Sequence, residues 1–228
     1  MDLLFVRHGE SEANVLGRMQ GQLDSPLSAQ GREQAAVLGA WMAERSLSFD
    51  AAYCSPLRRA RETAEIVCRS LGRPAPLLDA ELQEVHSGTL QGLDAGEIAE
   101  RFPTFMQRDI TTLGDFEEFG GESYAAVQAR TERVIARLVA RHKNHEEAAS
   151  GDSQRVLVVA HGGIIFQLVK ALVCRPVPQV AIFRYGNCTS TLVRMRQRRG
   201  TYIGEVRWHL PLELIGGAAR DPALSAFR

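Results

Sequence analysis

Short apolar runs alternate along the chain with longer stretches in which apolar residues recur every three or four positions. The short runs predict buried strands at residues 3–6, 49–54, 77–79 and 155–160. The periodic stretches predict helices at residues 28–44, 55–71, 122–142 and 164–173. In the second helix, Ser55 and Pro56 are expected to be the N-cap and the first helical residue. Two last apolar runs, at residues 190–196 and 203–208, flank a polar turn and predict a hairpin.

This alternation of strands and helices is typical of an α/β fold, in which helices cover both faces of a mostly parallel sheet. The final hairpin makes a mixed sheet the expectation. We expect one domain over residues 1–215 and a C-terminal tail over residues 216–228. Residues 89–121 are acidic and irregular in pattern, which predicts either a lid or a solvated surface insertion. Residues 144–154 are polar and small, which predicts a flexible loop.

The balance of charge narrows the classes of function. The 228 residues include 27 Lys plus Arg and 27 Asp plus Glu, so the formal net charge is zero. Nucleic-acid-binding proteins usually carry a basic excess, so no nucleic-acid partner is expected. No apolar run has the length of a membrane span or of a signal-peptide core, so no membrane partner is expected either. The scattered cysteines, Cys54, Cys68, Cys174 and Cys188, favour reduced core thiols in a cytoplasmic protein.

Polar side chains follow the predicted strands where ligands bind in an α/β sheet, at the carboxyl edge. These residues are Arg7 and His8 after the first strand, Ser55, Arg58 and Arg59 after the second, Glu84 after the third, and His161 with Gly162 and Gly163 after the fourth. Two histidines, at least two arginines and one carboxylate are therefore expected to converge on one edge.

This set of side chains suggests phosphoryl transfer. Arginine binds phosphate oxygens through its planar fork, and a helix N-terminus after Gly162 offers unpaired N–H groups. A neutral imidazole can attack phosphorus as a nucleophile, and a second, cationic histidine would stabilise the charge that develops. A glutamate could protonate the leaving oxygen and later activate water. A glycine after each histidine would let the backbone approach a ligand closely.

Six motifs occur in a characteristic order. They are RHGES at 7–11 with Asn14 three positions on, GQLDSPLS at 21–28, SPLRRARETA at 55–64, LQE at 82–84 followed by Gly88 and Gln91–Gly92, GGES at 120–123, and VVAHGG at 158–163. In these motifs the chain resembles the histidine phosphatase superfamily, also called phosphoglycerate mutase-like, over roughly residues 2–195. The resemblance implies a three-layer α/β/α sandwich with a mostly parallel mixed central sheet, and it implies no metal and no cofactor.

Roles for individual residues follow from the resemblance alone. It implies that His8 is the phosphorylated nucleophile, that Arg7, Arg59 and His161 hold the phosphoryl group, and that Glu84 donates and accepts the proton. Arg59 is chosen over Arg58 because it directly precedes Ala60 in the motif. The implied substrate-binding residues are Ser11, Asn14, Gln20, Gly21 and Gly162. Ser11 and Asn14 could instead cap a helix or a turn.

The superfamily contains phosphatases and mutases. Mutases carry a tyrosine, a lysine and an adjacent arginine pair after the catalytic glutamate, where this chain has Ser87, Ala95 and only Arg108 between Arg101 and Arg130. We therefore expect a metal-independent phosphomonoesterase that acts on a small phosphorylated metabolite. The alternatives are a cofactor-dependent phosphoglycerate mutase and a low-activity module that binds a phosphorylated ligand. Members of the family are often dimers, so a homodimer is an additional expectation.

Overall fold

The computed structural model describes residues 1–108, 114–142, 154–173, 185–198 and 201–215. Its strands are β1 (Asp2–Arg7), β2 (Ala51–Cys54), β3 (Leu77–Leu78), β4 (Arg155–Ala160), β5 (Ser190–Arg198) and β6 (Thr201–Leu210). Its helices are α1 (Glu12–Val15), α2 (Ala29–Glu44), α3 (Arg58–Ser70), α4 (Ala95–Arg101), α5 (Pro103–Met106), α6 (Tyr124–Arg141), α7 (Gly162–Val173) and α8 (Leu212–Ile215). Short 3-10 helices are η1 (Ala80–Leu82), η2 (Gly88–Leu90) and η3 (Glu117–Phe119).

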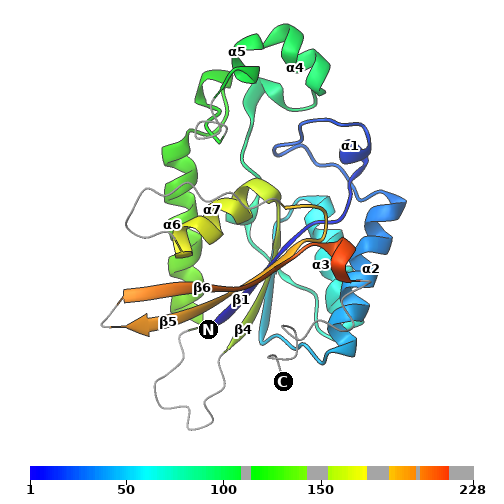
Figure 1. Cartoon of the computed structure of the whole chain (residues 1–228), viewed down its shortest axis with the longest axis vertical. Helices are drawn as coiled ribbons and strands as arrows, with labels where there is room; N and C mark the ends of the chain where they lie inside the picture. Colours follow the sequence, from blue (N-terminus) through cyan, green and yellow to red (C-terminus); the bar gives the residue numbers. More distant parts are fainter. Residues whose placement is uncertain (109–113, 143–153, 174–184, 199–200, 216–228) are drawn as a thin grey trace.

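A six-stranded sheet with the order β3-β2-β4-β1-β5-β6 forms the centre of the molecule (Figure 1). The pairs β1–β4, β4–β2 and β2–β3 are parallel. β5 pairs with β1 antiparallel and continues into β6 as an antiparallel hairpin. The mixed sheet and α/β class expected from the sequence are thus confirmed.

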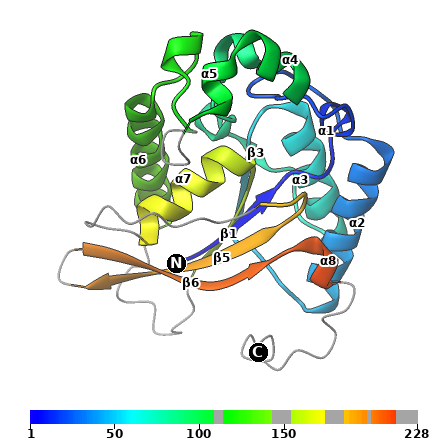
Figure 2. The ribbon, with the colours of Figure 1, turned by 45° about the horizontal axis from the view of Figure 1, so that its top comes forward.

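Helices cover the central strands on both faces of the sheet (Figure 2). Along β1, Leu3 and Phe5 join an apolar cluster with α6 and α7, whereas Leu4 and Val6 join a second cluster with α2 and α3. Successive side chains of a strand point to opposite faces, so both sets are buried. This burial on two sides explains why β1 and β4 are continuous apolar runs rather than alternating ones.

The helix after β2 begins later than the sequence predicts. α3 starts at Arg58, its N-cap is Leu57, and no side chain caps it. Ser55 is instead fully buried, and its hydroxyl bonds to the ring of His161. The expectation that Ser55 caps this helix is therefore wrong, because a tertiary partner takes the hydroxyl.

The segment after Glu84 is more ordered than its sequence pattern suggests. Asp94 caps α4 and forms a capping box with Glu97, in which each side chain accepts an N–H of the other residue. The residues Leu90, Ile98, Phe105 and Phe119 form a small apolar cluster of their own. Although the sequence pattern of residues 89–121 is irregular, the described part contains short helices, which these apolar positions stabilise.

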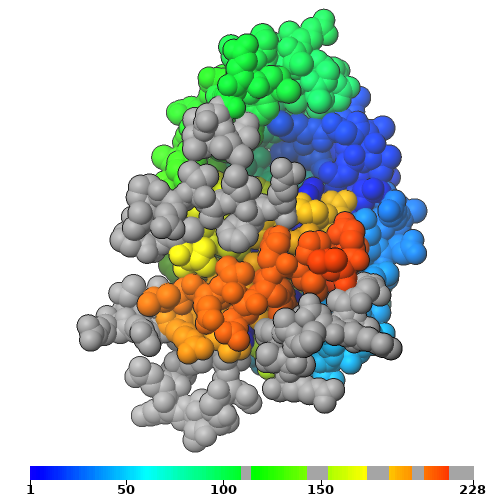
Figure 3. All heavy atoms as spheres, viewed as in Figure 1, coloured from blue at the N-terminus to red at the C-terminus, as the bar shows by residue number. Residues whose placement is uncertain are grey.

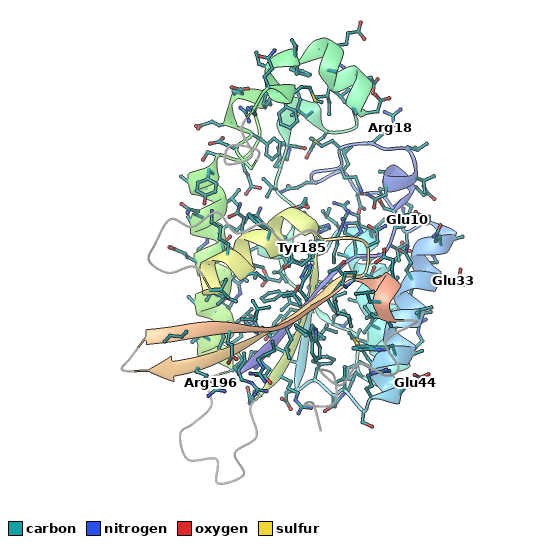
Figure 4. The ribbon with its side chains drawn as sticks, viewed as in Figure 1. Glu10, Arg18, Glu33, Glu44, Tyr185 and Arg196 are labelled. Atoms are coloured by element: carbon teal, nitrogen blue, oxygen red, sulfur yellow. The ribbon has the colours of Figure 1, made fainter. Side chains whose placement is uncertain are left out.

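The same segment rests against the loop that follows α1 (Figure 3). Met19 N–H donates to the carbonyl of Leu93 at 2.9 Å, and Gly92 N–H donates to the carbonyl of Met19 at 2.8 Å. Arg18 lies between the two segments (Figure 4), where its guanidinium donates to the carbonyl of Gly92. These bonds hold the α4–α5 segment beside the residues that follow β1.

Some expectations fall on other parts of the chain. The polar loop at 144–154 lies outside the described residues except for Gln154, and so do Cys174 and the tail at 216–228. Cys54, Cys68 and Cys188 are buried free thiols. Within the described residues, none of the helices combines the length and the apolar character that a membrane span requires.

Two leucines on parallel strands provide a test of this core. Leu157 on β4 is fully buried, whereas Leu78 on the edge strand β3 is 56% exposed. We expect Leu157→Ala to lower the free energy of unfolding by about 2–5 kcal/mol, because it leaves a cavity between tightly packed layers. Leu78→Ala should change it by no more than about 0.5 kcal/mol. Urea unfolding followed by circular dichroism measures both, and equal effects would contradict the layer arrangement.

Candidate active site

Two histidines lie side by side at the carboxyl edge of the sheet. His8 follows β1 and His161 follows β4, and the pairing of Arg7 with Ala160 brings the two strand ends level. The ring centroids are 5.1 Å apart, and both side chains are buried. The parallel pairing of β1 and β4 therefore places together the two histidines that the sequence assigned to this edge.

The carbonyl of Gly9 determines which nitrogen of His8 carries a proton. His8 Nδ1 lies 2.6 Å from Gly9 O, and because a carbonyl only accepts, Nδ1 must be the donor. Burial lowers the pKa of His8 well below its ordinary value, and the cations Arg7 and Arg59 lower it further. The ring is therefore neutral at neutral pH, and its Nε2 lone pair is available as a nucleophile.

His161 is oriented by Ser55. The hydroxyl of Ser55 lies 2.8 Å from His161 Nε2 and accepts the N–H of Leu57 at 3.3 Å. Burial, reinforced by Arg59, lowers the pKa of His161 well below its ordinary value, so the ring is neutral. We assign the Ser55 hydroxyl as the donor to Nε2, which places the ring proton of His161 on Nδ1. The expectation of a cationic second histidine is thus wrong for the free protein, and His161 is instead a neutral donor.

Arg59 is a buried cation held by backbone carbonyls. Its side chain is 1% exposed, and its terminal nitrogens donate to Leu23 O at 2.6 Å and to Gly21 O at 2.8 Å. Burial lowers the pKa of Arg59 to about 10, with Glu84 acting in the opposite direction. The guanidinium thus stays protonated at neutral pH, and the loop that contains Gly21 fixes its orientation.

Arg7 is the last residue of β1, and its side chain lies close to the start of α7. Its guanidinium donates to the carbonyl of Tyr185, a residue that lies close to α7 in Figure 4. Gly162 is the first residue of α7, and a Cβ added to it would lie 3.8 Å from Arg7 Nε. Burial lowers the pKa of Arg7, while Glu84 raises it. Arg7 is therefore a second, partly buried cation beside His8.

Three buried N–H donors at this edge lack a partner within the described residues. They are Arg7 Nε, Arg59 Nε and His161 Nδ1. An unpaired buried donor costs about 1–3 kcal/mol, and more when it is charged. Three of them together, two on guanidinium groups, indicate an anion with several acceptor oxygens, such as phosphate. Arg58 lies outside this group, since its side chain is 49% exposed and is 3.8 Å from Glu62.

Glu84 supplies a carboxylate at the N-terminus of α7. Its Oε1 accepts the N–H groups of Val85 at 2.9 Å and of Ile164 at 3.0 Å, and its Oε2 accepts that of Gly163 at 3.0 Å. A Cβ at position 163 would lie 2.6 Å from Oε1, so a glycine is needed there for this approach. The N-terminus of α7, which was expected to bind phosphate, therefore also binds Glu84.

Ser11, Asn14 and Gln20 form one hydrogen-bonded group. Ser11 caps α1 in a capping box with Asn14, and its hydroxyl lies 2.8 Å from Gln20 Oε1. The capping alternative raised for Ser11 and Asn14 therefore describes their geometry. The bonds use the side-chain oxygens of Asn14 and Gln20, which leaves their NH₂ groups as the donors for other partners.

The backbone after His8 is tied to α3. Gly9 N–H donates to Thr63 Oγ1 at 3.0 Å, and that hydroxyl donates to the carbonyl of Arg59 at 2.7 Å. A Cβ at position 9 would collide with the carbonyl oxygen of Gly31 in α2. Packing against α2 thus requires the glycine after His8.

Three contributors to the site were not assigned their roles from the sequence: Ser55, Thr63 and Tyr185. Ser55 directly follows a predicted strand, which correctly predicts its position at the carboxyl edge of the sheet. The Pro that follows it favours a capping role, which the structure does not show. Thr63 lies four residues after Arg59, on the same side of a helix, and this spacing could have linked them. Tyr185 contributes a backbone carbonyl, for which a sequence contains no signal.

The described residues favour an anion over a metal cation. They contain no group of three His, Cys, Asp or Glu side chains that could hold a metal. Two guanidinium groups beside His8 and His161 would also repel a metal cation.

Comparison with known proteins agrees with this geometry. A family model described as histidine phosphatase superfamily (branch 1) matches residues 3–205. The chain belongs to the histidine phosphatase superfamily. The glucosyl-3-phosphoglycerate phosphatase of Mycobacterium tuberculosis is 35% identical over 211 residues, which cover 91% of this chain and 92% of that protein. The adenosylcobalamin/alpha-ribazole phosphatase of Salmonella typhi is 34% identical over 201 residues, covering 84% and 90% of the two chains.

Solved structures of this superfamily share the fold. A mycobacterial glucosyl-3-phosphoglycerate phosphatase in complex with VO3 superimposes with a TM-score of 0.78 at 33% identity, covering 92% of this chain and 99% of that chain. The chain is thus a phosphatase of the phosphoglycerate mutase-like fold, a phosphoric monoester hydrolase. The relatives named here act on small phosphorylated substrates.

The two neighbouring arginines of α3 test the anion site. We expect Arg59→Met to weaken the binding of orthophosphate at least tenfold, because about 1.5–3 kcal/mol is lost with a hydrogen bond to a charged group. Arg58→Met should change the affinity less than about twofold, since an exposed charge contributes little. Isothermal titration calorimetry measures both, with circular dichroism as the control for folding. Equal losses would contradict the assignment of Arg59.

Proposed function

We propose that this phosphatase hydrolyses phosphate monoesters in two steps, without a metal ion, through a phosphohistidine on His8. One observation carries the proposal. The neutral ring of His8 has Nδ1 bonded to Gly9 O, and it lies among buried N–H donors of Arg7, Arg59 and His161 that have no partner in the described residues. A nucleophile surrounded by anion donors suits attack on phosphorus.

In the first step, His8 Nε2 forms a bond to phosphorus as the bond from phosphorus to the ester oxygen breaks. The N–H groups of Arg7, Arg59 and His161 donate to the phosphoryl oxygens, which hold the negative charge of the transition state. Glu84 gives its proton to the leaving oxygen, so that an alcohol departs and a carboxylate remains.

In the second step, the Glu84 carboxylate takes a proton from water while the water oxygen attacks phosphorus. The bond from phosphorus to Nε2 breaks, and its electron pair returns to His8. Orthophosphate leaves and Glu84 is protonated again, which restores the starting state. The position of Glu84 supports its role in proton transfer. Its carboxylate lies at the start of α7, and it is close enough to Arg7 and Arg59 to raise the pKa of both.

Hydrolysis is favoured over phosphoglycerate mutation because Arg108, the only basic residue between Arg101 and Arg130, is already paired. Arg108 donates to the carbonyl of Asp115 and pairs with Glu118 at 2.8 Å. Ser87 and Ala95 occupy the positions where mutases of the family carry a tyrosine and a lysine. A bisphosphate would find one set of donors here and not two.

The rest of the substrate is proposed to lie between α1 and the α4–α5 segment. The NH₂ groups of Asn14 and Gln20, oriented by Ser11, would donate to it, and Gly162 N–H would donate to the phosphoryl group. Gly21 would act through its carbonyl, which holds Arg59. The α4–α5 segment would then be the lid, and its residues would select the alcohol.

The compartment we propose is the cytoplasm. Cys54, Cys68 and Cys188 are buried and unpaired. Reduced thiols of this kind are the rule where glutathione and thioredoxin keep cysteines reduced.

Replacement of the nucleophile tests the covalent step. We expect His8→Ala to lower turnover of para-nitrophenyl phosphate by at least about a thousandfold, because no other imidazole nitrogen can accept the phosphoryl group. Rapid acid quench with ³²P-labelled substrate should trap phosphoenzyme in the unaltered protein and in His142→Ala, but not in His8→Ala. EDTA should leave the rate unchanged. Activity that requires a metal, or phosphoenzyme in His8→Ala, would refute the proposal.

The protonation state of His8 is a second test. Its pKa is lowered well below the ordinary value by burial, so protonation is lost as the pH rises through that lowered pKa. The ring should therefore stay neutral, with the proton on Nδ1, from pH 8 down to well below about 6.5, the ordinary value. Imidazole ¹⁵N NMR, assigned with His8→Asn, measures this. A midpoint near the ordinary value would contradict the burial that lowers the pKa of His8.

A further inference from the structure

Arg130 lies on α6, outside the group of residues around His8, and is only 7% exposed. Its NH1 donates to two backbone carbonyls, Glu81 O at 2.8 Å and Gln83 O at 2.7 Å. Gln83 directly precedes Glu84 in the chain, and Glu81 lies three residues before it. Arg130 therefore holds the backbone on the N-terminal side of Glu84, the residue that is proposed to transfer the proton.

The other side of the same guanidinium binds Glu122. Arg130 Nε and NH2 donate to the two carboxylate oxygens at 2.9 and 2.8 Å, which is the bidentate geometry that only arginine provides. Glu122 Oε2 also accepts the N–H of His86 at 2.8 Å, and Glu122 N–H donates to His86 O at 2.9 Å. His86 is two residues after Glu84, so its bonds to Glu122 hold the backbone on the C-terminal side of Glu84.

The turn before Glu122 fits closely against the same loop. A Cβ on Gly121 would collide with the carbonyl oxygen of His86 and would lie 2.9 Å from Gly88 N. The second glycine of the GGES motif thus lets the turn reach the loop that contains Glu84. Arg130, Glu122 and this turn form one clamp on both sides of a single residue.

We propose that Arg130 and Glu122 are a positioning pair that sets the place of Glu84, and that their role is specific to proton transfer. The inference rests on the proposed function of Glu84 as the general acid. The clamp contacts backbone on both sides of Glu84, while the carboxylate itself is held by N–H groups of α7. If the clamp is lost, the carboxylate can remain at α7 but its backbone is no longer fixed, and proton transfer is sensitive to displacements below 1 Å.

The leaving group reveals such a role. An alkyl phosphate needs a proton on its departing oxygen, whereas 2,4-dinitrophenyl phosphate releases a stable phenolate without one. We expect Arg130→Met to slow alcohol release from propyl phosphate at least about tenfold, and phenolate release less than about threefold, since a general acid contributes about 10²–10⁴-fold. Single-turnover kinetics measures the phosphorylation step for both esters.

Matched variants separate position from charge and from folding. Arg133→Met removes a neighbouring arginine of α6 that is 58% exposed and pairs with the Glu81 carboxylate, and it should leave both rates unchanged. Arg130→Lys keeps the charge but not the fork, so it should behave like Arg130→Met. Glu122→Gln, which keeps the size of the side chain, should shift the ratio of the two rates in the same direction and serves if Arg130→Met does not fold.

A double-mutant cycle tests whether Arg130 acts through Glu84. If Arg130 acts only through Glu84, adding Arg130→Met to Glu84→Gln should lower the propyl phosphate rate no further. Equal losses on both esters, unchanged rates, or full rescue by Arg130→Lys would overturn the inference. Phosphoenzyme that persists in His8→Ala would instead refute the proposed function, so the two failures are distinguishable.

Discussion

The parallel pairing of β1 with β4 is the constraint on which the site depends. It ends both strands at the same level, so that His8 and His161 meet with their ring centroids 5.1 Å apart. The neighbouring strand β2 ends beside β4 and delivers Ser55 and the start of α3. The hairpin on the far side of β1 brings in the Cys188 backbone, whose N–H donates to His8 O. His8, Ser55, Arg59 and His161 are therefore all attached to a strand end or to the first turns after it.

Two guanidinium groups, of Arg7 and Arg59, lie away from solvent at this edge of the sheet, and other groups must offset the cost of their desolvation. Burial lowers the pKa of Arg7 and of Arg59, which means that the charged forms are disfavoured there. Carbonyl groups of Leu23, Gly21 and Tyr185 accept the terminal N–H groups and offset part of this cost. Burial, reinforced by the same charges, keeps both histidines neutral, so one arrangement provides a nucleophile and the donors around it.

The sequence was sufficient for the fold class because burial on two faces leaves a strong signal. The β4 run at 155–160 was predicted with the bounds that the structure has. The order of strand ends also sufficed to bring His8, Arg59 and His161 to one edge. It did not suffice where one side chain had two possible partners. Ser55 bonds across the sheet to His161 instead of capping a helix, and Arg130 acts on backbone carbonyls that no pattern marks.

The unpaired N–H groups of Arg7, Arg59 and His161 have a consequence for stability. A ligand that binds only the folded state adds to its free energy of unfolding by mass action, about 1.4 kcal/mol for each tenfold rise in concentration above the dissociation constant. Orthophosphate is both the product of the proposed reaction and the anion that would complete these hydrogen bonds. The free energy of unfolding would then be highest when the product of the enzyme accumulates. Product inhibition and resistance to unfolding would therefore rise together.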